Sequence, residues 1–99
     1  MKKIEIIIKP ENKNVITKKL GSLGLKKVNI SEIKNTDIIE NKYTAEIKLE
    51  FVVKYTEVDK FVEAVKESFQ TGVESGKIFV SPVENAVDIK TSLEGVEAL

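Results

Sequence analysis

Cysteine, histidine and tryptophan are all absent from this sequence of 99 residues. Without cysteine the chain has neither a disulfide framework nor a thiolate metal site. Without histidine it lacks the commonest metal ligand and the usual general base at neutral pH. A nucleophile–base pair cannot be built from the usual residues, and no pair of carboxylates stands out. We therefore expect a protein that is not an enzyme and that holds no metal or cofactor.

The sequence also has no excess of charge of either sign. The 16 basic and 16 acidic residues cancel to a formal net charge of zero, so the electrostatic footprint of a nucleic-acid or anionic-membrane binder is missing. The first apolar run, residues 4–8, is interrupted by Glu5 and is far too short for a secretory leader or a membrane span. We expect a cytoplasmic protein without direct membrane insertion, whose partners are proteins or small molecules.

The length of the chain allows a single domain, residues 1–99, with a modest hydrophobic core. Association with copies of itself would enlarge that core. An oligomer is therefore the expected state.

Alternating apolar residues predict the clearest strands. At residues 45–53 (AEIKLEFVV) every second residue from Ala45 is apolar, and Glu46, Lys48 and Glu50 fall on the other face, as in a half-buried strand. Residues 2–9 alternate in the same way and also carry Ile7 on the opposite face. Apolar residues on both faces are typical of a central strand.

Two further strands have weaker patterns. One runs from Val28 and ends at residues 35–37. The other begins at residues 77–80 and is expected to resume, past Pro82, at residues 86–89.

Two helices are predicted between the strands. The first follows Pro10, with Asn12 as its expected N-cap and Gly24 in the left-handed position that ends it. The second begins near Thr56, which stands three residues before Asp59 in a variant of the capping box. Its apolar residues recur at the spacing of a helix that faces a sheet. They are Val58, Phe61, Val62, Val65 and Phe69.

The four phenylalanines are expected in the core, because each lies on a predicted apolar face. They are Phe51, Phe61, Phe69 and Phe79. The short C-terminal tail, residues 91–99, is expected to hold one turn of helix at most.

The predicted order of elements is strand, helix, strand, strand, helix, strand. With both helices on one face of an antiparallel sheet, this is a ferredoxin-like βαββαβ fold of the α+β class. By parity the other face of the sheet carries Ile7 and Val52, and a closed cyclic oligomer would cover it.

The C-terminal third carries a specific motif. Residues 71–84 read TGVESGKIFVSPVE, which closely resembles the signature of the PII family of nitrogen-regulatory signalling proteins. Residues 1–10 (MKKIEIIIKP) and 31–34 (SEIK) also fall where that family has similar residues, as do residues 89–91 and 97–99. The resemblance covers nearly the whole chain.

The resemblance implies a compact homotrimer with three clefts between subunits, where an adenine nucleotide (ATP, ADP or AMP) acts as an effector. It also implies a long loop that reports the bound state to a transporter, an enzyme or a transcription factor. Here that loop is cut to about residues 35–44, and Tyr43 at its base is no counterpart of the family's nucleotidylated tyrosine. Ile39 and Glu46 replace a glutamine and a lysine of the family's 2-oxoglutarate and magnesium site, so no 2-oxoglutarate response is expected.

The resemblance also implies which residues meet the nucleotide. A glycine lets backbone N–H groups approach phosphate oxygens, and a lysine supplies a mobile charge. The family's two arginines in the last strand align with Asp88 and Lys90, so one phosphate clamp is lost and the other is weakened. The implied nucleotide-binding residues are Ile7, Asn29, Asn35, Thr36, Asp37, Glu50, Val52, Gly76, Lys77 and Lys90.

Other readings stay open at this point. Gly76 can be a turn glycine, and Lys77 and Lys90 can be solvated surface lysines. The main hypothesis is a sensor that regulates a transporter or a metabolic enzyme by protein contact. The alternatives are a structural scaffold trimer without a ligand, and a sensor of another small effector such as a cyclic dinucleotide or bicarbonate.

Overall fold

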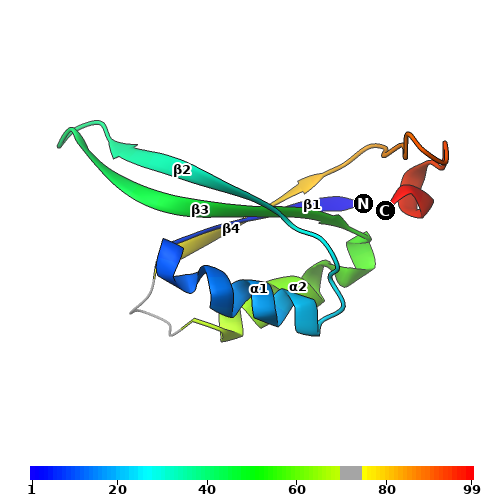
Figure 1. The fold of residues 1–99 in the computed structure, drawn as a ribbon, viewed down its shortest axis with the longest axis horizontal. Helices are drawn as coiled ribbons and strands as arrows, with labels where there is room; N and C mark the ends of the chain where they lie inside the picture. The colour runs from blue at the N-terminus through cyan, green and yellow to red at the C-terminus, as the bar shows by residue number, and fades with distance from the viewer. Residues whose placement is uncertain (70–74) are drawn as a thin grey trace.

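The computed structural model describes residues 1–69 and 75–99, which form one antiparallel sheet and two helices (Figure 1). The strands are β1 (Lys2–Ile8), β2 (Asn29–Asp37), β3 (Lys42–Val53) and β4 (Gly76–Pro82), in the spatial order β2-β3-β1-β4. The helices are α1 (Lys13–Ser22) and α2 (Val58–Glu67), and the short 3-10 turns are η1 (Pro10–Asn12), η2 (Tyr55–Glu57) and η3 (Gly95–Ala98). Both helices lie side by side on one face of the sheet, so the predicted ferredoxin-like α+β fold is confirmed.

The core lies between the sheet and the helices. In β1 the residues of one face are buried, whereas Glu5 and Ile7 on the other face are half-buried. From α2, Phe61 meets Phe51 of β3 edge-on, with 5.2 Å between the ring centroids. Each fully buried side chain of this size contributes about 1.5–3 kcal/mol. The buried apolar residues are Ile4, Ile6, Ile8, Ile16, Leu20, Ile47, Leu49, Phe51, Val53, Phe61, Ala64 and Val65.

The end of α1 confirms the predicted role of Gly24. Its φ of 97° is a left-handed conformation that glycine adopts without a Cβ clash. The Gly24 N–H donates to the carbonyl of Gly21 at 3.0 Å, and the Leu25 N–H donates to the carbonyl of Leu20 at 3.2 Å. This is a Schellman motif, which satisfies carbonyl groups at the helix end. The chain then returns toward the sheet through the loop of residues 23–28.

The predicted helix caps are wrong. Asn12 and Glu57 precede α1 and α2, and neither side chain makes a capping hydrogen bond. Each is the last residue of a 3-10 turn and already has helical angles, φ −91° and ψ −4° at Asn12, whereas a capping side chain needs extended backbone. Thr56 lies inside η2, so it does not cap the helix together with Asp59.

The segment 35–44 differs from the expected shortened loop, because most of it is paired strand. β2 and β3 stay in register as far as the pair of Asp37 and Lys42, so only residues 38–41 lie outside the strands. β1 pairs with β3 only as far as Ile47. Beyond that point the hairpin continues past the sheet as a two-stranded ribbon, which projects from the body of the molecule (Figure 1).

The hairpin tip, residues 38–41, has a defined conformation. The Asp37 carboxylate accepts hydrogen bonds from the N–H groups of Ile39 at 2.9 Å and Glu40 at 3.0 Å. Asn41 adopts a left-handed φ of 54°, which asparagine tolerates better than most residues. The tip therefore presents Ile38 and Ile39 to solvent, with 91% and 95% of their surfaces exposed.

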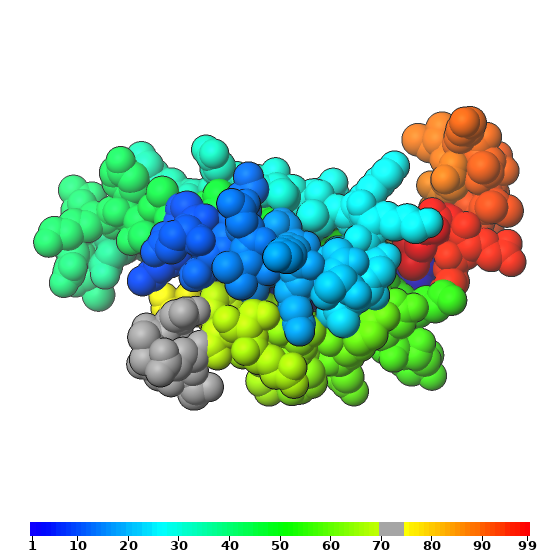
Figure 2. All heavy atoms as spheres, turned by 60° about the horizontal axis from the view of Figure 1, so that its bottom comes forward, coloured from blue at the N-terminus to red at the C-terminus, as the bar shows by residue number. Residues whose placement is uncertain are grey.

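The predicted second part of the fourth strand, residues 86–89, is not a strand. β4 ends at Pro82, and the described chain beyond it makes one isolated bridge only. The Asp88 carboxylate accepts hydrogen bonds from the N–H groups of Lys90 at 2.9 Å and Thr91 at 3.0 Å, which closes a turn instead. The tail ends in the single turn η3, as expected, and lies at the opposite end of the molecule from the hairpin tip (Figure 2).

Phe79 is not in the core. Its register partner is Glu5, so it lies on the sheet face that the helices leave uncovered, and 50% of its surface is exposed. The other three phenylalanines are buried in the core or pack against it, as predicted. We call the uncovered surface the helix-free face. By register it carries Lys3, Glu5, Ile7, Asn29, Ser31, Lys48, Glu50, Val52, Lys77, Phe79 and Ser81.

Candidate functional site

Charged side chains pair along the helix-free face. Lys3 Nζ lies 2.9 Å from Glu5 Oε1 and 3.4 Å from Glu50 Oε2, and Lys48 Nζ lies 3.4 Å from Glu50 Oε1. The hydrogen bond from Lys3 lowers the pKa of Glu5, with partial burial acting in the opposite direction, and the same bond raises the pKa of Lys3. Glu50, which was predicted to meet a ligand, is therefore already held between two lysines.

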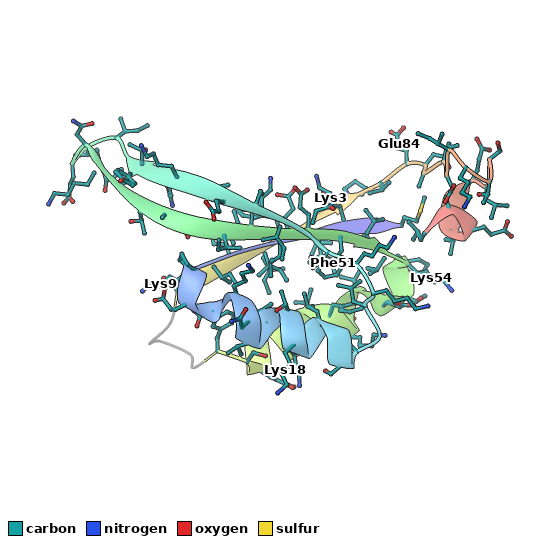
Figure 3. All side chains as sticks on the ribbon, viewed as in Figure 1. Lys3, Lys9, Lys18, Phe51, Lys54 and Glu84 are labelled. Atoms are coloured by element: carbon teal, nitrogen blue, oxygen red, sulfur yellow. The ribbon has the colours of Figure 1, made fainter. Side chains whose placement is uncertain are left out.

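Replacing Lys3 with Met is expected to raise the pKa of Glu5 toward its ordinary value of 4.5, because the hydrogen bond and the charge that lower it are removed. In the unaltered chain the stability from this pair is present above the ordinary pKa and is lost as the pH falls through the lowered folded-state pKa. Carboxylate titration by NMR measures the change. The matched control is Lys18→Met, far from this face (Figure 3). An unchanged Glu5 pKa in the Lys3 variant would show that the ion pair does not form.

The first group of predicted site residues lies where β4 pairs with β1. The register places Lys77 opposite Ile7 and Gly76 opposite Ile8. A Cβ on residue 76 would lie 3.0 Å from the Ile7 carbonyl oxygen, so the close contact between the two strands favours glycine here. Gly76 begins a strand rather than a turn, and Lys77 is exposed on the helix-free face. Residues 71–74 of the motif lie outside the described residues.

The second group lies toward β2, at a hollow of about 740 Å³. Asn29 begins β2 and pairs with Glu50, so residues 51–53 of β3 have no β2 partner beside them. The loop 23–28, the end of β3, the start of α2 and the C-terminal residue Leu99 line the space, and so does Val52. We call this space the lysine-rimmed hollow, because Lys26, Lys27, Lys54 and Lys60 surround it.

The remaining predicted residues lie elsewhere. Asn35, Thr36 and Asp37 belong to the projecting ribbon, where the Asn35 amide donates to Glu46 Oε1 at 2.7 Å. Asp37 is used to hold the hairpin tip. Lys90 lies in the turn of the C-terminal segment. That segment lies at the opposite end of the molecule from the ribbon (Figure 2).

One protomer therefore does not bring the predicted residues together. Glu50 lies on β3 and Lys77 on β4, and β1 runs between them. At a strand spacing of roughly 4.8 Å their backbones are about 10 Å apart across the sheet, and Asn29 on β2 lies one strand further away. The first group, at Gly76 and Lys77, and the second group, at Asn29 and Glu50, thus lie toward opposite edges of a single sheet.

The sequence did not point to the lysines of the hollow. Lys26 and Lys27 follow the helix-ending Gly24, and Lys54 follows the last residue of β3. Nothing in the order of these residues indicates that two distant segments meet. The only available signal was that Lys26, Lys27 and Lys54 each lie just outside a predicted element, at an element boundary.

Within residues 1–69 and 75–99, no three Asp, Glu, Cys or His side chains gather where they could hold a metal ion. In the same ranges no helix has the length and apolar character to cross a membrane.

The fold and the candidate site together define a small ferredoxin-like domain with an uncovered sheet face and a cationic hollow. A family model described as nitrogen regulatory protein P-II matches residues 1–93 of the chain. The chain therefore belongs to the P-II family, whose members are signalling and regulatory proteins.

Individual relatives agree over the full length. The nitrogen regulatory protein P-II of Haemophilus influenzae is 34% identical and that of Azospirillum brasilense 32% identical, each with the whole of both chains covered. The alignment with the second runs over 112 positions against the 99 residues here, so that relative has positions which this chain lacks. Among solved structures, Arabidopsis thaliana PII bound to citrate superposes with a TM-score of 0.85 at 30% identity, covering 99% of this chain and 91% of that one.

Proposed function

We propose that this chain is a cytoplasmic regulatory subunit that forms a homotrimer and binds an adenine nucleotide (ATP, ADP or AMP) in the clefts between protomers. Through protein contact it regulates a transporter or a metabolic enzyme. The observation that carries the proposal is the separation of Gly76 and Lys77 from Asn29 and Glu50 on one sheet. Two copies placed side by side can join the two groups that a single copy keeps apart.

Exposed apolar residues support assembly with further copies. On the helix-free face, half of the surface of Phe79 is exposed, and Ile7 and Val52 are only half-buried. In the C-terminal segment Val87 and Ile89 are 55% and 96% exposed. Contact with neighbouring protomers would remove these surfaces from water, and a closed ring does so without leaving a free end.

The chemistry of the joined cleft suits a nucleotide with few phosphates. The Asn29 amide offers both a donor and an acceptor to the edge of a base. Lys77 of the neighbouring protomer supplies one mobile positive charge for a phosphate. The Asp88 carboxylate accepts hydrogen bonds from backbone N–H groups of its own turn. Lys90 offers a phosphate a single point charge, whereas an arginine would offer two parallel hydrogen bonds. We therefore expect little preference for the triphosphate.

The ribbon supports regulation without a 2-oxoglutarate response. Glu46 accepts a hydrogen bond from Asn35 at 2.7 Å, and its negative charge would repel a dicarboxylate. Tyr43 lies in β3 with the Lys34 ammonium 4.1 Å from its ring centroid, so it is not presented on a loop for nucleotidylation. The exposed Ile38 and Ile39 at the hairpin tip are the surface that we expect the regulated protein to contact.

Replacing Lys77 with Ala is expected to reduce the thermal stabilisation that ATP, ADP or AMP gives to the purified protein. A ligand at one hundred times its Kd stabilises a folded protein by about 2.7 kcal/mol, and a weakened Kd shrinks that gain. Thermal denaturation scans and calorimetry measure the effect. Lys18→Ala is the matched control, because it removes an exposed lysine far from the sheet, and sedimentation should give the same trimer for both variants.

The same experiment separates the other candidate functions. Trimers that give no heat with any adenine nucleotide would contradict the sensor and favour a scaffold without a ligand. Heat with a cyclic dinucleotide or with bicarbonate alone would favour another effector. A monomer at working concentration would contradict the proposal, because the cleft requires a second copy.

A further inference from the structure

The outer edge of β2 is an open edge of the sheet. The strand order β2-β3-β1-β4 puts β2 at one side, and in the part of the chain that the structure describes only β3 pairs with it. Every residue of β2 is exposed except Ile33, which is half-buried. An edge strand of this length carries a row of backbone N–H and C=O groups that can pair with a further strand.

The side chains of this edge complement those of a second copy of the same strand. When two copies of β2 run antiparallel with their Ile33 residues opposite each other, Glu32 of each copy faces Lys34 of the other. On the next positions outward, Ser31 faces Asn35. Opposite charges that face each other across a strand pair stabilise it, whereas like charges destabilise it.

The neighbouring registers bring like charges together. With the centre one residue earlier, Glu32 would face Glu32 of the other copy, and with the centre one residue later, Lys34 would face Lys34. Charges on an edge strand normally discourage pairing. Here their symmetric spacing about Ile33 favours one antiparallel register and opposes the registers on either side of it.

Both charged groups are available for such a contact. Within the described ranges, neither Glu32 nor Lys34 has an opposite charge within 4.0 Å. The Lys34 ammonium lies 4.1 Å from the centroid of the Tyr43 ring, an interaction that keeps it close to the strand. The pair therefore need not break an ion pair of its own protomer in order to form.

We propose that two copies of this chain pair edge to edge through β2, in an antiparallel contact centred on Ile33. Since opposed residues of paired strands share a face, the helices of both copies lie on the same side of the joined sheet. The contact uses the same surface on both copies, so it closes after two. It goes beyond the proposed ring and its nucleotide cleft, because Glu32, Ile33 and Lys34 belong to neither group of cleft residues.

A single introduced cysteine tests the register, since the chain has no cysteine of its own. Directly opposed residues of antiparallel strands have Cα atoms about 4.5–5.5 Å apart, a separation that a disulfide spans. We therefore expect Ile33→Cys to give a linked dimer on non-reducing gels after mild oxidation with diamide. An Ile33→Cys variant that stays unlinked while copies still form the ring would overturn the proposal, and the edge would then be open to an extended segment of another protein.

Ile30→Cys is the matched control for the linking experiment. In the proposed register its two thiols lie six positions apart, roughly 20 Å. The Ile30 side chain is 43% exposed, more than the half-buried Ile33, so random collision would link it at least as fast. We expect at least tenfold slower linking than in Ile33→Cys. Equal rates for the two variants would overturn the proposal.

Charge reversal tests the two ion pairs. Glu32→Lys or Lys34→Glu alone places like charges opposite each other in both pairs, and either is expected to weaken the β2 association about tenfold at low salt. Sedimentation velocity over a series of protein concentrations measures it. A mixture of the two variants restores opposite charges at both pairs and should associate as the unaltered chain does. A mixture that associates no better than either variant alone would overturn the proposal.

The control for charge reversal is Lys18→Glu, which changes the net charge as Lys34→Glu does but lies on α1, away from the sheet (Figure 3). Glu32 and Lys34 face Ile47 and Ala45 of β3, so reversal creates no like-charge pair within the protomer's own ladder. Circular dichroism melting checks that each variant is folded. Equal weakening by Lys18→Glu would overturn the proposal, because net charge alone would then explain the loss.

These experiments also separate the β2 contact from the proposed cleft. Lys77→Ala is expected to weaken nucleotide binding and to leave the linking of Ile33→Cys unchanged. Rings that bind nucleotide but do not link through residue 33 contradict the β2 contact alone. Linked pairs of chains that form no ring and bind no nucleotide support the β2 contact and contradict the proposed function.

Discussion

Replacement of Ile6 with Asp is expected to leave no cooperatively folded protein. Ile6 lies in the central strand β1, fully buried, with Leu49 opposite it on β3 and Ile78 on β4. The variant loses about 1.5–3 kcal/mol of apolar burial and adds several kcal/mol for burying a carboxyl group without a partner. That sum is comparable with the total stability of a small domain, about 5–15 kcal/mol. Circular dichroism during urea titration should show no unfolding transition.

The matched control changes the same residue type at the hairpin tip. Ile39 is 95% exposed, so Ile39→Asp should leave the free energy of unfolding within about 0.5 kcal/mol of the unaltered chain. A cooperative transition of ordinary midpoint in the Ile6 variant would mean that β1 does not turn this face toward the helices.

Truncation of Phe61 to Ala is expected to lower the free energy of unfolding by about 3–5 kcal/mol. Its ring is 2% exposed and contacts the Phe51 ring at a centroid distance of 5.2 Å and an interplanar angle of 63°. The variant loses the apolar burial, leaves a cavity under the sheet, and removes the edge-to-face aromatic pair. In urea titration the midpoint should fall while the slope stays the same.

Phe79→Ala is the control for this truncation, because half of that ring is exposed on the helix-free face. The protomer should lose less than about 1 kcal/mol, within the range of ordinary surface substitutions. If the helix-free face is covered by other copies, sedimentation of this variant should show weaker assembly. A loss equal to that of Phe61→Ala in a dissociated protomer would contradict the placement of Phe79.

The strands with one buried face were the easiest to predict. In β3 the alternation of apolar and charged residues is strict from residue 45 to residue 51, because one face meets the helices and the other does not. Gly24 was also predictable, since a helix that turns back toward a sheet commonly needs a left-handed residue at its end. In both places a local pattern carries enough information to fix the local structure.

The sequence-based predictions were wrong mainly where pairing with residues distant in the sequence decides the local structure. Ile78, Phe79 and Val80 are apolar on both faces, so only the register with β1 turns Phe79 away from the core. The ribbon around residues 35–44 has little apolar character, and its backbone ladder forms through register with β3 rather than through burial. At residues 86–89 the pattern resembled a strand, but the side chain of Asp88 satisfies the backbone locally in a turn.

For the candidate site, the sequence predicted residues but not their arrangement. Pairs such as Ile7 with Lys77, or Asn29 with Glu50, follow once the sheet order is known. The lysine-rimmed hollow could not be predicted, because segments far apart in the sequence supply its lysines. The arrangement of the protomers depends on contacts between the surfaces of separate chains. No pattern along one chain encodes those contacts.

The order of the strands has a consequence for how the protein is made. β1 leaves the ribosome first but is the central strand, and its neighbours are synthesised much later: Ile4 pairs with Phe51 and with Val80. Contacts this far apart along the chain slow folding, because a long loop must close before they form. During translation the isoleucines of β1 therefore stay without their strand partners until β4 has been synthesised. That interval is when a nascent chain of this topology is most exposed to aggregation and most in need of a chaperone.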